Sequence, residues 1–218
     1  MNWSAVIFDL DGLMIDSEPI ALEVWRELAA EHDREISEEL YRQVIGHTPI
    51  FGVRHLRSAL ELPLSEEEIL EEYWRRRTKL MCAKVKPVKG LVGLLELLQE
   101  RGIAKAVASN SPRDYVTAVV ESLGLSNFFK CVRSSEDVAE GKPAPDVYED
   151  ALRCLEIDSG SALVLEDSPA GVKAAKAAGL TCYAVPSHEM QSADFSEADE
   201  VIGSIAEIGL LFRERFEK

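Results

Sequence analysis

The stretch VIFDLDGLMIDS, residues 6–17, decides how the rest of the chain is interpreted. It continues an apolar run that starts at Ala5, and such a run is typical of a short buried strand in a parallel sheet. Asp9 and Asp11 then stand past the carboxyl end of that strand, at the edge where open α/β sheets bind ligands. Gly12 lets the backbone turn sharply. Alone, this segment fits two interpretations equally: an Asp-rich turn that caps a helix, or two acids that share a cation or a proton.

Size and charge limit the class of protein. The chain has 218 residues, of which 46% are hydrophobic and 29% charged. It can therefore bury a sizeable core in one domain, or in one domain with a smaller second one. Its formal net charge is −15, which argues against a nucleic acid or an anionic membrane as partner, because their binding sites need clustered cations. A small anionic substrate stays possible, since the electrostatic field at a binding site can be positive although the net charge of the whole protein is negative.

The remaining composition predicts a soluble, cytoplasmic protein, by default a monomer. Asp9 and Asp11 interrupt any apolar region of a leader peptide, and no apolar run approaches the roughly 18–20 residues that a membrane helix needs. The cysteines have neither a C-x-x-C pair nor a zinc-ligand spacing, so we expect reduced, mostly buried thiols. They are Cys82, Cys131, Cys154 and Cys182.

Residues 17–83 carry helical patterns and no strand pattern. Apolar side chains recur at helical spacing from Ile20 to Leu28, and the sequence GHTP at residues 46–49 separates two shorter helices. Ser65 and Glu68 have the spacing of a capping box, which predicts the start of a long helix. We therefore expect a separate helical domain over residues 17–83, inserted directly after the first strand.

The rest of the chain alternates strands with helices. We predict strands at residues 5–8, 103–108, 129–133, 162–165, 181–185 and, as a short sixth, 201–202. Two Ser-Pro pairs are interpreted as the N-cap and first residue of the following helix: Ser111 with Pro112, and Ser168 with Pro169. The alternation predicts a doubly wound parallel sheet of Rossmann-like type, formed by residues 1–16 and 84–218.

Polar residues follow four of the predicted strands. They are Asp9 and Asp11 after the first, Ser109 and Asn110 after the second, Lys142 beyond the third, and Glu166 and Asp167 after the fourth. Parallel strands bring these ends to one edge of the sheet. Carboxylate oxygens suit a hard cation such as Mg²⁺, while an ammonium, a hydroxyl and helix N–H groups suit a phosphate. The set indicates a phosphoryl-transfer site, where positioning and charge neutralisation dominate catalysis.

The segments FDLDG, VASNS, GKPAP and LEDSPAG, between residues 8 and 171, resemble in order the four motifs of the haloacid dehalogenase superfamily. The helical insert resembles the C1 cap of that superfamily, and the chain is similar to the branch that contains β-phosphoglucomutase and small sugar-phosphate phosphatases. The resemblance implies an Mg²⁺-dependent enzyme that acts on a small phosphorylated metabolite.

The same resemblance implies a role for each residue. Asp9 would be the nucleophile that forms an aspartyl-phosphate, and Asp11 the acid and base. Mg²⁺ would be held by Asp9, the backbone carbonyl of Asp11, and Asp167, with Glu166 as a direct or indirect ligand. The phosphate would be bound by Ser109, Asn110 and Lys142, and the leaving group would be recognised by His47 and Thr48.

The sequence disfavours three alternatives to a phosphatase. β-Phosphoglucomutases carry a histidine where Ala21 stands and an arginine where Pro49 stands, so both departures argue against a mutase. The dehalogenase branch lacks the second acid, which is present here as Asp11. A non-catalytic phosphate-binding protein is disfavoured because the predicted catalytic residues are all intact. We therefore predict a phosphatase, with a sugar phosphate as substrate.

Overall fold

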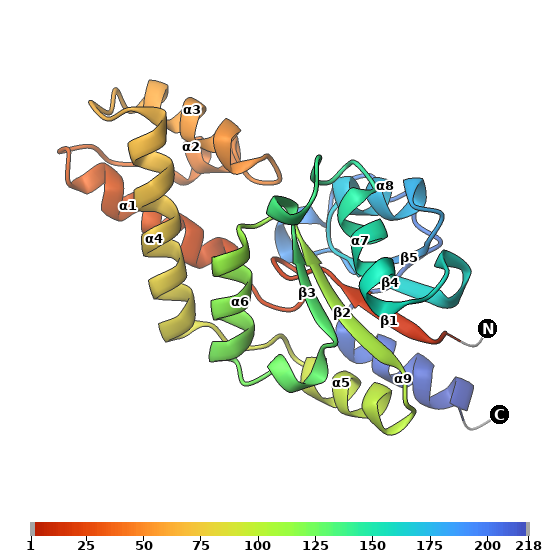
Figure 1. The fold of residues 1–218 in the computed structure, drawn as a ribbon. Coiled ribbons are helices and arrows are strands. Elements are labelled where there is room, and N and C mark those ends of the chain that lie inside the picture. The colour runs from red at the N-terminus through yellow and green to blue at the C-terminus, as the bar shows by residue number, and fades with distance from the viewer. Residues whose placement is uncertain (1–2, 217–218) are drawn as a thin grey trace. The chain divides into compact units, whose positions relative to one another are not determined.

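The computed structural model describes residues 3–216, and the chain forms two compact units (Figure 1). The first, here called the sheet unit, comprises Met1–Asp16 and Lys86–Lys218. The second, the helical unit, comprises Ser17–Val85. Residues 1–2 and 217–218, which belong to the predicted Rossmann-like domain, lie outside the described residues.

Within residues 3–216, six parallel strands form one sheet in the order β3-β2-β1-β4-β5-β6. Their bounds are β1 (Ala5–Phe8), β2 (Ala104–Ser109), β3 (Cys131–Ser134), β4 (Ala162–Glu166), β5 (Thr181–Ala184) and β6 (Glu200–Val201). Strand β1 lies at the centre and is completely buried, as its apolar run predicts. This order confirms the Rossmann-like parallel sheet.

Helices cover both faces of the sheet (Figure 1). They are α5 (Leu91–Glu100), α6 (Arg113–Ser122), α7 (Asp146–Leu155), α8 (Pro169–Ala177) and α9 (Ile205–Phe216). Helices α7 and α8 share one apolar core with alternate residues of β1, β2 and β4, including Ile7, Ala106 and Val164. Helices α5 and α9 pack together on the opposite face. Burial of alternate strand residues on two faces explains why the strands are almost wholly apolar.

Two strands extend further toward the candidate site than the sequence predicts. Ser109 is the last residue of β2 and pairs with Ser134, and Glu166 is the last residue of β4 and pairs with Ala184. Both were expected in the loops that follow. Because they belong to the sheet, its backbone hydrogen bonds fix their positions.

The helical unit has its own apolar core. It contains α1 (Glu18–Ala30), α2 (Glu38–Arg42), α3 (Pro49–Ala59) and α4 (Glu66–Lys84). Buried side chains such as Trp25, Leu56 and Ile69 join these helices. The predicted capping box at the start of α4 is confirmed, since Ser65 and Glu68 each bond the other's backbone N–H.

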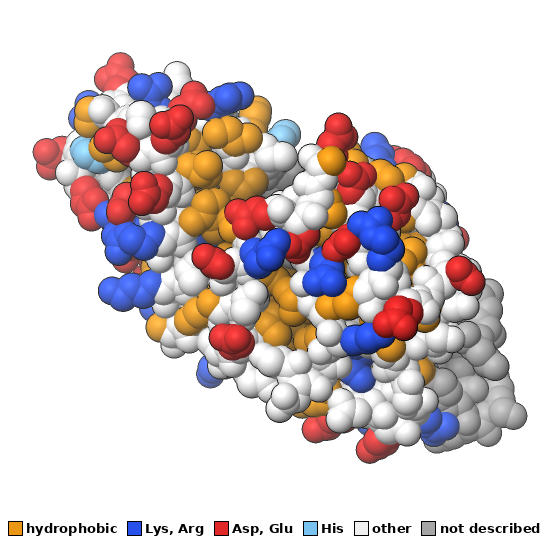
Figure 2. Space-filling view, in the orientation of Figure 1, with side chains coloured by type: hydrophobic (Ala, Val, Ile, Leu, Met, Phe, Trp, Pro, Cys, Tyr) orange, Lys and Arg blue, Asp and Glu red, His pale blue; other side chains and the backbone are white. Residues whose placement is uncertain are grey.

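The expectation of four reduced cysteines is wrong for one pair. Cys131 on β3 and Cys154 on α7 form a disulfide, whereas Cys82 and Cys182 are free. In the part of the chain that the structure describes, no helix has the length and apolar character to cross a membrane. Charged side chains of both signs are interspersed over the face shown in Figure 2. Several exposed side chains of the molecule form ion pairs, for example Lys84 with Glu23 at 2.6 Å.

Candidate active site

The strand order brings the sequence-predicted acids of the sheet unit to one edge. Strand β1 lies between β2 and β4, so that Asp9 follows a strand flanked by those that end in Ser109 and Glu166. Asp9, Ser109, Lys142, Glu166 and Asp167 are all buried, with 0–8% of their surface exposed. Buried charged groups are stable only when they are paired or bind a cation, so the contacts of this cluster decide its chemistry.

Lys142 is the centre of the cluster. Its ammonium Nζ donates to Asp9 Oδ1 at 2.5 Å, to Glu166 Oε1 at 2.6 Å and to the Ala108 carbonyl at 2.9 Å. Burial acts to lower the pKa of Lys142, but the carboxylates of Asp9 and Glu166 together outweigh it and raise the pKa. Lys142 is therefore a permanent cation that joins three strand ends.

The backbone of Lys142 is held by the side-chain amide of Asn110. Asn110 Nδ2 donates to the Lys142 carbonyl at 3.0 Å, and Oδ1 accepts the Lys142 N–H at 2.8 Å. Gly141 permits this approach, because a Cβ there would lie 2.7 Å from Asn110 Oδ1. Asn110, predicted to bind phosphate, thus also determines where Lys142 stands.

Glu166 accepts hydrogen bonds through both carboxylate oxygens. Oε1 accepts from Lys142 and from the Tyr148 hydroxyl at 2.5 Å, while Oε2 accepts from the N–H groups of Asp167 and Ser168 and from the Ser168 hydroxyl. Ser168 also caps α8, as predicted, by accepting the Gly171 N–H. Glu166 consequently fixes both the ammonium and the turn that carries Asp167.

The acids of this cluster fit a hard divalent cation. Carboxylate oxygens of Asp9, Glu166 and Asp167 lie within 4.8 Å of one another. Burial raises the pKa of Asp9 to about 8 although Lys142 lowers it, and burial, Asp9 and Glu166 raise the pKa of Asp167 well above its usual range. Ionisation of all three acids beside one ammonium would give excess negative charge that a bound cation offsets, and an all-oxygen donor set is the kind that Mg²⁺ and similar ions prefer.

Among the described residues, the group of converging acids does not include Asp11. The carboxylate of Asp11 turns toward α6 instead. Its Oδ1 accepts the Tyr115 hydroxyl and its Oδ2 accepts the Ser111 hydroxyl, both at 2.7 Å. Ser111 was expected to be the N-cap of α6. That prediction is wrong, since Pro112 occupies the N-cap position and the Ser111 hydroxyl donates to the carboxylate of Asp11 instead.

Ser109 is fixed at the same edge. Its hydroxyl oxygen accepts the backbone N–H of Ser111 at 3.1 Å, and the residue is 2% exposed. The side chain thus orders the turn between β2 and α6. This turn carries the predicted phosphate-binding residues Ser109 and Asn110 and the Asp11 partner Ser111.

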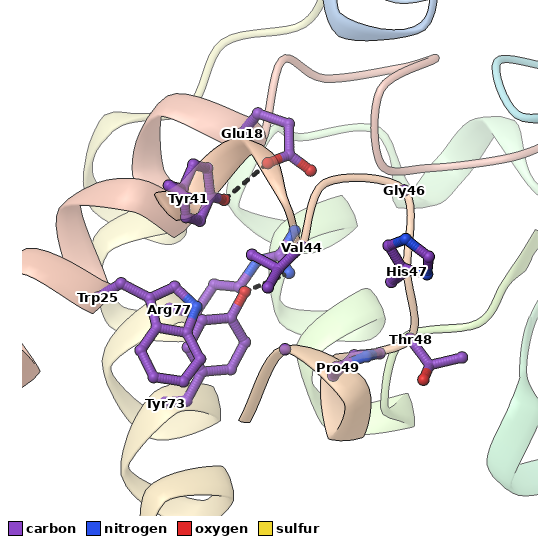
Figure 3. Close-up of a pocket in the computed structure, with 11 residues that line it drawn as sticks. Glu18, Trp25, Tyr41, Val44, Gly46, His47, Thr48, Pro49, Tyr73 and Arg77 are labelled. Atoms are coloured by element: carbon purple, nitrogen blue, oxygen red, sulfur yellow. Dashed lines mark hydrogen bonds between the residues drawn. The ribbon is translucent and has the colours of Figure 1, made fainter. Parts of the chain in front are cut away.

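His47 and Thr48 lie in the helical unit, in a different unit from the other predicted site residues. Thr48 is the N-cap of α3, and the ring of His47 stacks on Phe51 with centroids 4.3 Å apart. Both residues line a pocket of about 60 Å³ (Figure 3).

The same pocket is lined by residues that the sequence did not single out. Glu18 accepts the Tyr41 hydroxyl at 2.7 Å, and Arg77 donates to the Tyr73 hydroxyl at 2.9 Å (Figure 3). The pocket therefore offers an acid, a guanidinium and hydroxyl groups within one apolar frame.

Two residues of the sheet unit were also missed, Tyr115 and Tyr148. Both occupy buried positions on the apolar faces of α6 and α7, where the sequence pattern predicts core. The signal that could have found them is chemical, because a buried tyrosine hydroxyl generally has a hydrogen-bond partner. Their partners, Asp11 and Glu166, are distant in sequence.

Comparison with known proteins agrees with this geometry. The family model described as haloacid dehalogenase-like hydrolase matches residues 6–185, from β1 to just past β5. This match includes every strand end that contributes to the site. The chain belongs to the haloacid dehalogenase-like hydrolase family.

Three similar proteins cover most of the chain. The bifunctional riboflavin kinase/FMN phosphatase of Arabidopsis thaliana is 32% identical over 95% of this chain, which spans only 55% of that protein's length. A phosphorylated carbohydrates phosphatase of Thermotoga maritima is 31% identical over 81% of this chain and 82% of its own. The crystal structure of CbbY from Rhodobacter sphaeroides in complex with phosphate has a TM-score of 0.83 and 30% identity, covering 95% of this chain and 96% of that one.

The close approach of Gly171 to Glu166 gives a first prediction. A Cβ at position 171 would overlap the Glu166 carboxylate, whereas a Cβ at Gly93, the third residue of α5, meets no atom within 4 Å. Alanine should favour either helix by up to about 1 kcal/mol. We expect Gly93→Ala to raise the free energy of unfolding, and Gly171→Ala to lower it by about 1–3 kcal/mol through overpacking. Urea unfolding measures both, and equal stabilisation of the two variants would contradict the predicted overlap.

The raised pKa values give a second prediction. A carboxyl whose folded pKa is about 8 retains its proton through neutral pH, and a bound cation must displace that proton. Affinity for a divalent cation should therefore rise by at least about twentyfold between about pH 6.5 and about pH 8.5, with proton release on binding. Calorimetric titration with Mg²⁺ in two buffers of different protonation enthalpy measures both quantities. An affinity independent of pH would show that the acids are already ionised.

Proposed function

We propose that the protein is an Mg²⁺-dependent phosphatase that hydrolyses a small phosphomonoester, specifically a sugar phosphate, through an aspartyl-phosphate. The observation that carries this proposal is the buried ammonium of Lys142, held between Asp9 and Glu166. It places a fixed positive charge against the acid at the end of β1, where a transferring phosphoryl group needs its charge neutralised.

In the first step, an oxygen of Asp9 forms a bond to phosphorus while the ester P–O bond breaks and Asp11 gives its proton to the leaving oxygen. In the second step, water attacks the phosphorus of the aspartyl-phosphate. Asp11 takes a proton from that water, and Asp9 is released as a carboxylate. Lys142 and Ser109 bind the phosphoryl oxygens throughout, while Asn110 binds beside them and holds Lys142 in place.

Mg²⁺ would be held by Asp9, Asp167 and the Asp11 backbone carbonyl, with Glu166 adjoining, and it would neutralise charge on the phosphoryl oxygens. Glu166 is the least available of these groups, because both its oxygens already accept hydrogen bonds from the protein. Its contribution is therefore chiefly to hold Lys142 and the turn before Asp167. The fit to a divalent cation rests on the oxygen donors that converge at this edge.

The names of the similar proteins support the substrate class. One acts on phosphorylated carbohydrates, one includes an FMN phosphatase, and one binds phosphate. We propose that residues 17–83 form a cap domain whose pocket recognises the leaving group, with His47 and Thr48 as specificity residues. Hydroxyl, acidic and guanidinium groups in that pocket suit a polyhydroxylated leaving group, which both donates and accepts hydrogen bonds.

The reaction itself can be tested with the purified protein. We expect it to release phosphate from 4-nitrophenyl phosphate in the presence of Mg²⁺, and EDTA or Asp9→Asn to lower kcat by at least about a thousandfold, because the nucleophile and charge neutralisation are both essential. Phosphate release is measured colorimetrically. Activity that survives both changes would refute the mechanism. Isomerisation of a sugar phosphate without net phosphate release would identify a mutase, and phosphate binding without turnover a binding protein.

Substrate recognition by the helical unit is tested with a matched pair of histidines. His47 and His55 both stack on Phe51. Among the described residues that line the pocket, His47 is included and His55 is not. On the best substrate from a panel of sugar and nucleotide monophosphates, His47→Ala should raise KM about tenfold, the loss of about 1.4 kcal/mol of binding. His55→Ala should stay within about twofold. Equal effects would remove His47 from the proposed recognition site.

A further inference from the structure

Two hydroxyl groups on the α6 side of the site hold the carboxylate of Asp11. Tyr115, in the first turn of α6, donates to Oδ1, and Ser111, two residues before α6, donates to Oδ2. We infer that Ser111 and Tyr115 are positioning residues, which set the orientation in which Asp11 transfers its proton. This inference rests on the proposed function, in which Asp11 is the acid and base.

Ser111 is itself held rigidly. Its backbone N–H donates to the Ser109 hydroxyl at 3.1 Å, and its backbone carbonyl accepts the Ser134 hydroxyl at 2.7 Å. Ser109 and Ser134 are paired residues at the ends of β2 and β3. The backbone of Ser111 is therefore held by residues at the ends of two neighbouring strands, which keeps its hydroxyl beside Asp11.

The Tyr115 hydroxyl and the backbone of Asp11 are equally constrained. Tyr115 is 1% exposed, so its ring is fixed by packing. Asp11 lies in a tight turn in which the Gly12 N–H donates to the Ile15 carbonyl at 2.8 Å, and Asp11 forms a bridge with Ile15. The hydroxyls of Ser111 and Tyr115 then bond the two oxygens of the Asp11 side chain and orient it.

This orientation matters because Asp11 has an alternative environment nearby. Asp9, Glu166 and Asp167 converge with Lys142. Asp11 is near enough to this cluster for its charge to contribute to the raised pKa of Asp9. Two neutral hydroxyl donors keep it apart. When substrate binds, one Asp11 oxygen exchanges its hydroxyl partner for the leaving oxygen, while the second hydroxyl keeps the carboxyl group in place. Misplacement of a catalytic group by about 1 Å can cost up to about a hundredfold in rate.

Two substrates with different leaving groups distinguish a positioning role of Ser111 and Tyr115 from a merely structural one. A nitrophenolate leaves readily without a proton, whereas an alkyl alcohol needs one from Asp11. For Tyr115→Phe and Ser111→Ala we expect kcat on glycerol 2-phosphate to fall about tenfold with KM within about twofold. On 4-nitrophenyl phosphate we expect the rate of the first step, measured as the stopped-flow burst of nitrophenolate, to stay within about twofold of the unmodified enzyme, because only the later hydrolysis of the aspartyl-phosphate then needs Asp11. Ser111→Thr, which retains the hydroxyl, should restore most of the loss.

Ser122→Ala is the matched control, because its hydroxyl lies on the same helix and donates to the Val119 carbonyl. An equal loss in the rate of the first step on both substrates, or no loss on either, would overturn the positioning inference. Asp11→Asn measured in parallel tests the underlying assignment. If it hydrolyses the alkyl ester normally, the proposed role of Asp11 fails. If it is inactive on that ester while the hydroxyl variants are unaffected, only the inference about Ser111 and Tyr115 fails.

Discussion

The ammonium of Lys142 joins the ends of three strands. It bonds Asp9 after β1, Ala108 within β2 and Glu166 at the end of β4, and each contact is completely or almost completely buried. Removing one partner of a buried ion pair typically costs about 3–5 kcal/mol, which is a large part of the roughly 5–15 kcal/mol that stabilises a domain. The Lys142 ammonium, which would neutralise a phosphoryl group, thus also stabilises the buried carboxyl groups of Asp9 and Glu166.

Space at this edge is provided by glycines. The carboxylate of Asp167 occupies the position where a Cβ of Gly12 would lie, and that of Glu166 the position where a Cβ of Gly171 would lie. Gly12 also has a φ of 86°, which other residues rarely adopt. The acids can therefore approach one another only because the facing backbone carries no side chains, and their oxygens converge as a donor set that suits a cation.

The sequence predicted the sheet and the main acidic residues because both depend on local patterns combined with one topological rule. Asp9, Lys142, Glu166 and Asp167 each follow a recognisable strand, and a parallel sheet aligns such positions. The prediction at Ser111 failed because the Ser-Pro pattern is the same as at Ser168, where the cap forms. What distinguishes the two is Asp11, a hundred residues away. The disulfide between Cys131 and Cys154 could not be predicted either, since the spacing of cysteines in the sequence does not determine which of them pair.

Asp9 and Asp11 show how little of a carboxylate's role is set by its own segment. One strand and one turn deliver both side chains, with a single residue between them. Asp9 meets a buried ammonium and two further acids, an environment that suits a metal-bound nucleophile. Asp11 accepts hydrogen bonds from two neutral hydroxyls, one on α6 and one in the turn before it, and these bonds orient its carboxyl group. The neighbouring strands and helix therefore give the two acids the different environments that their proposed roles require, and the β1 motif provides only the pair of acids.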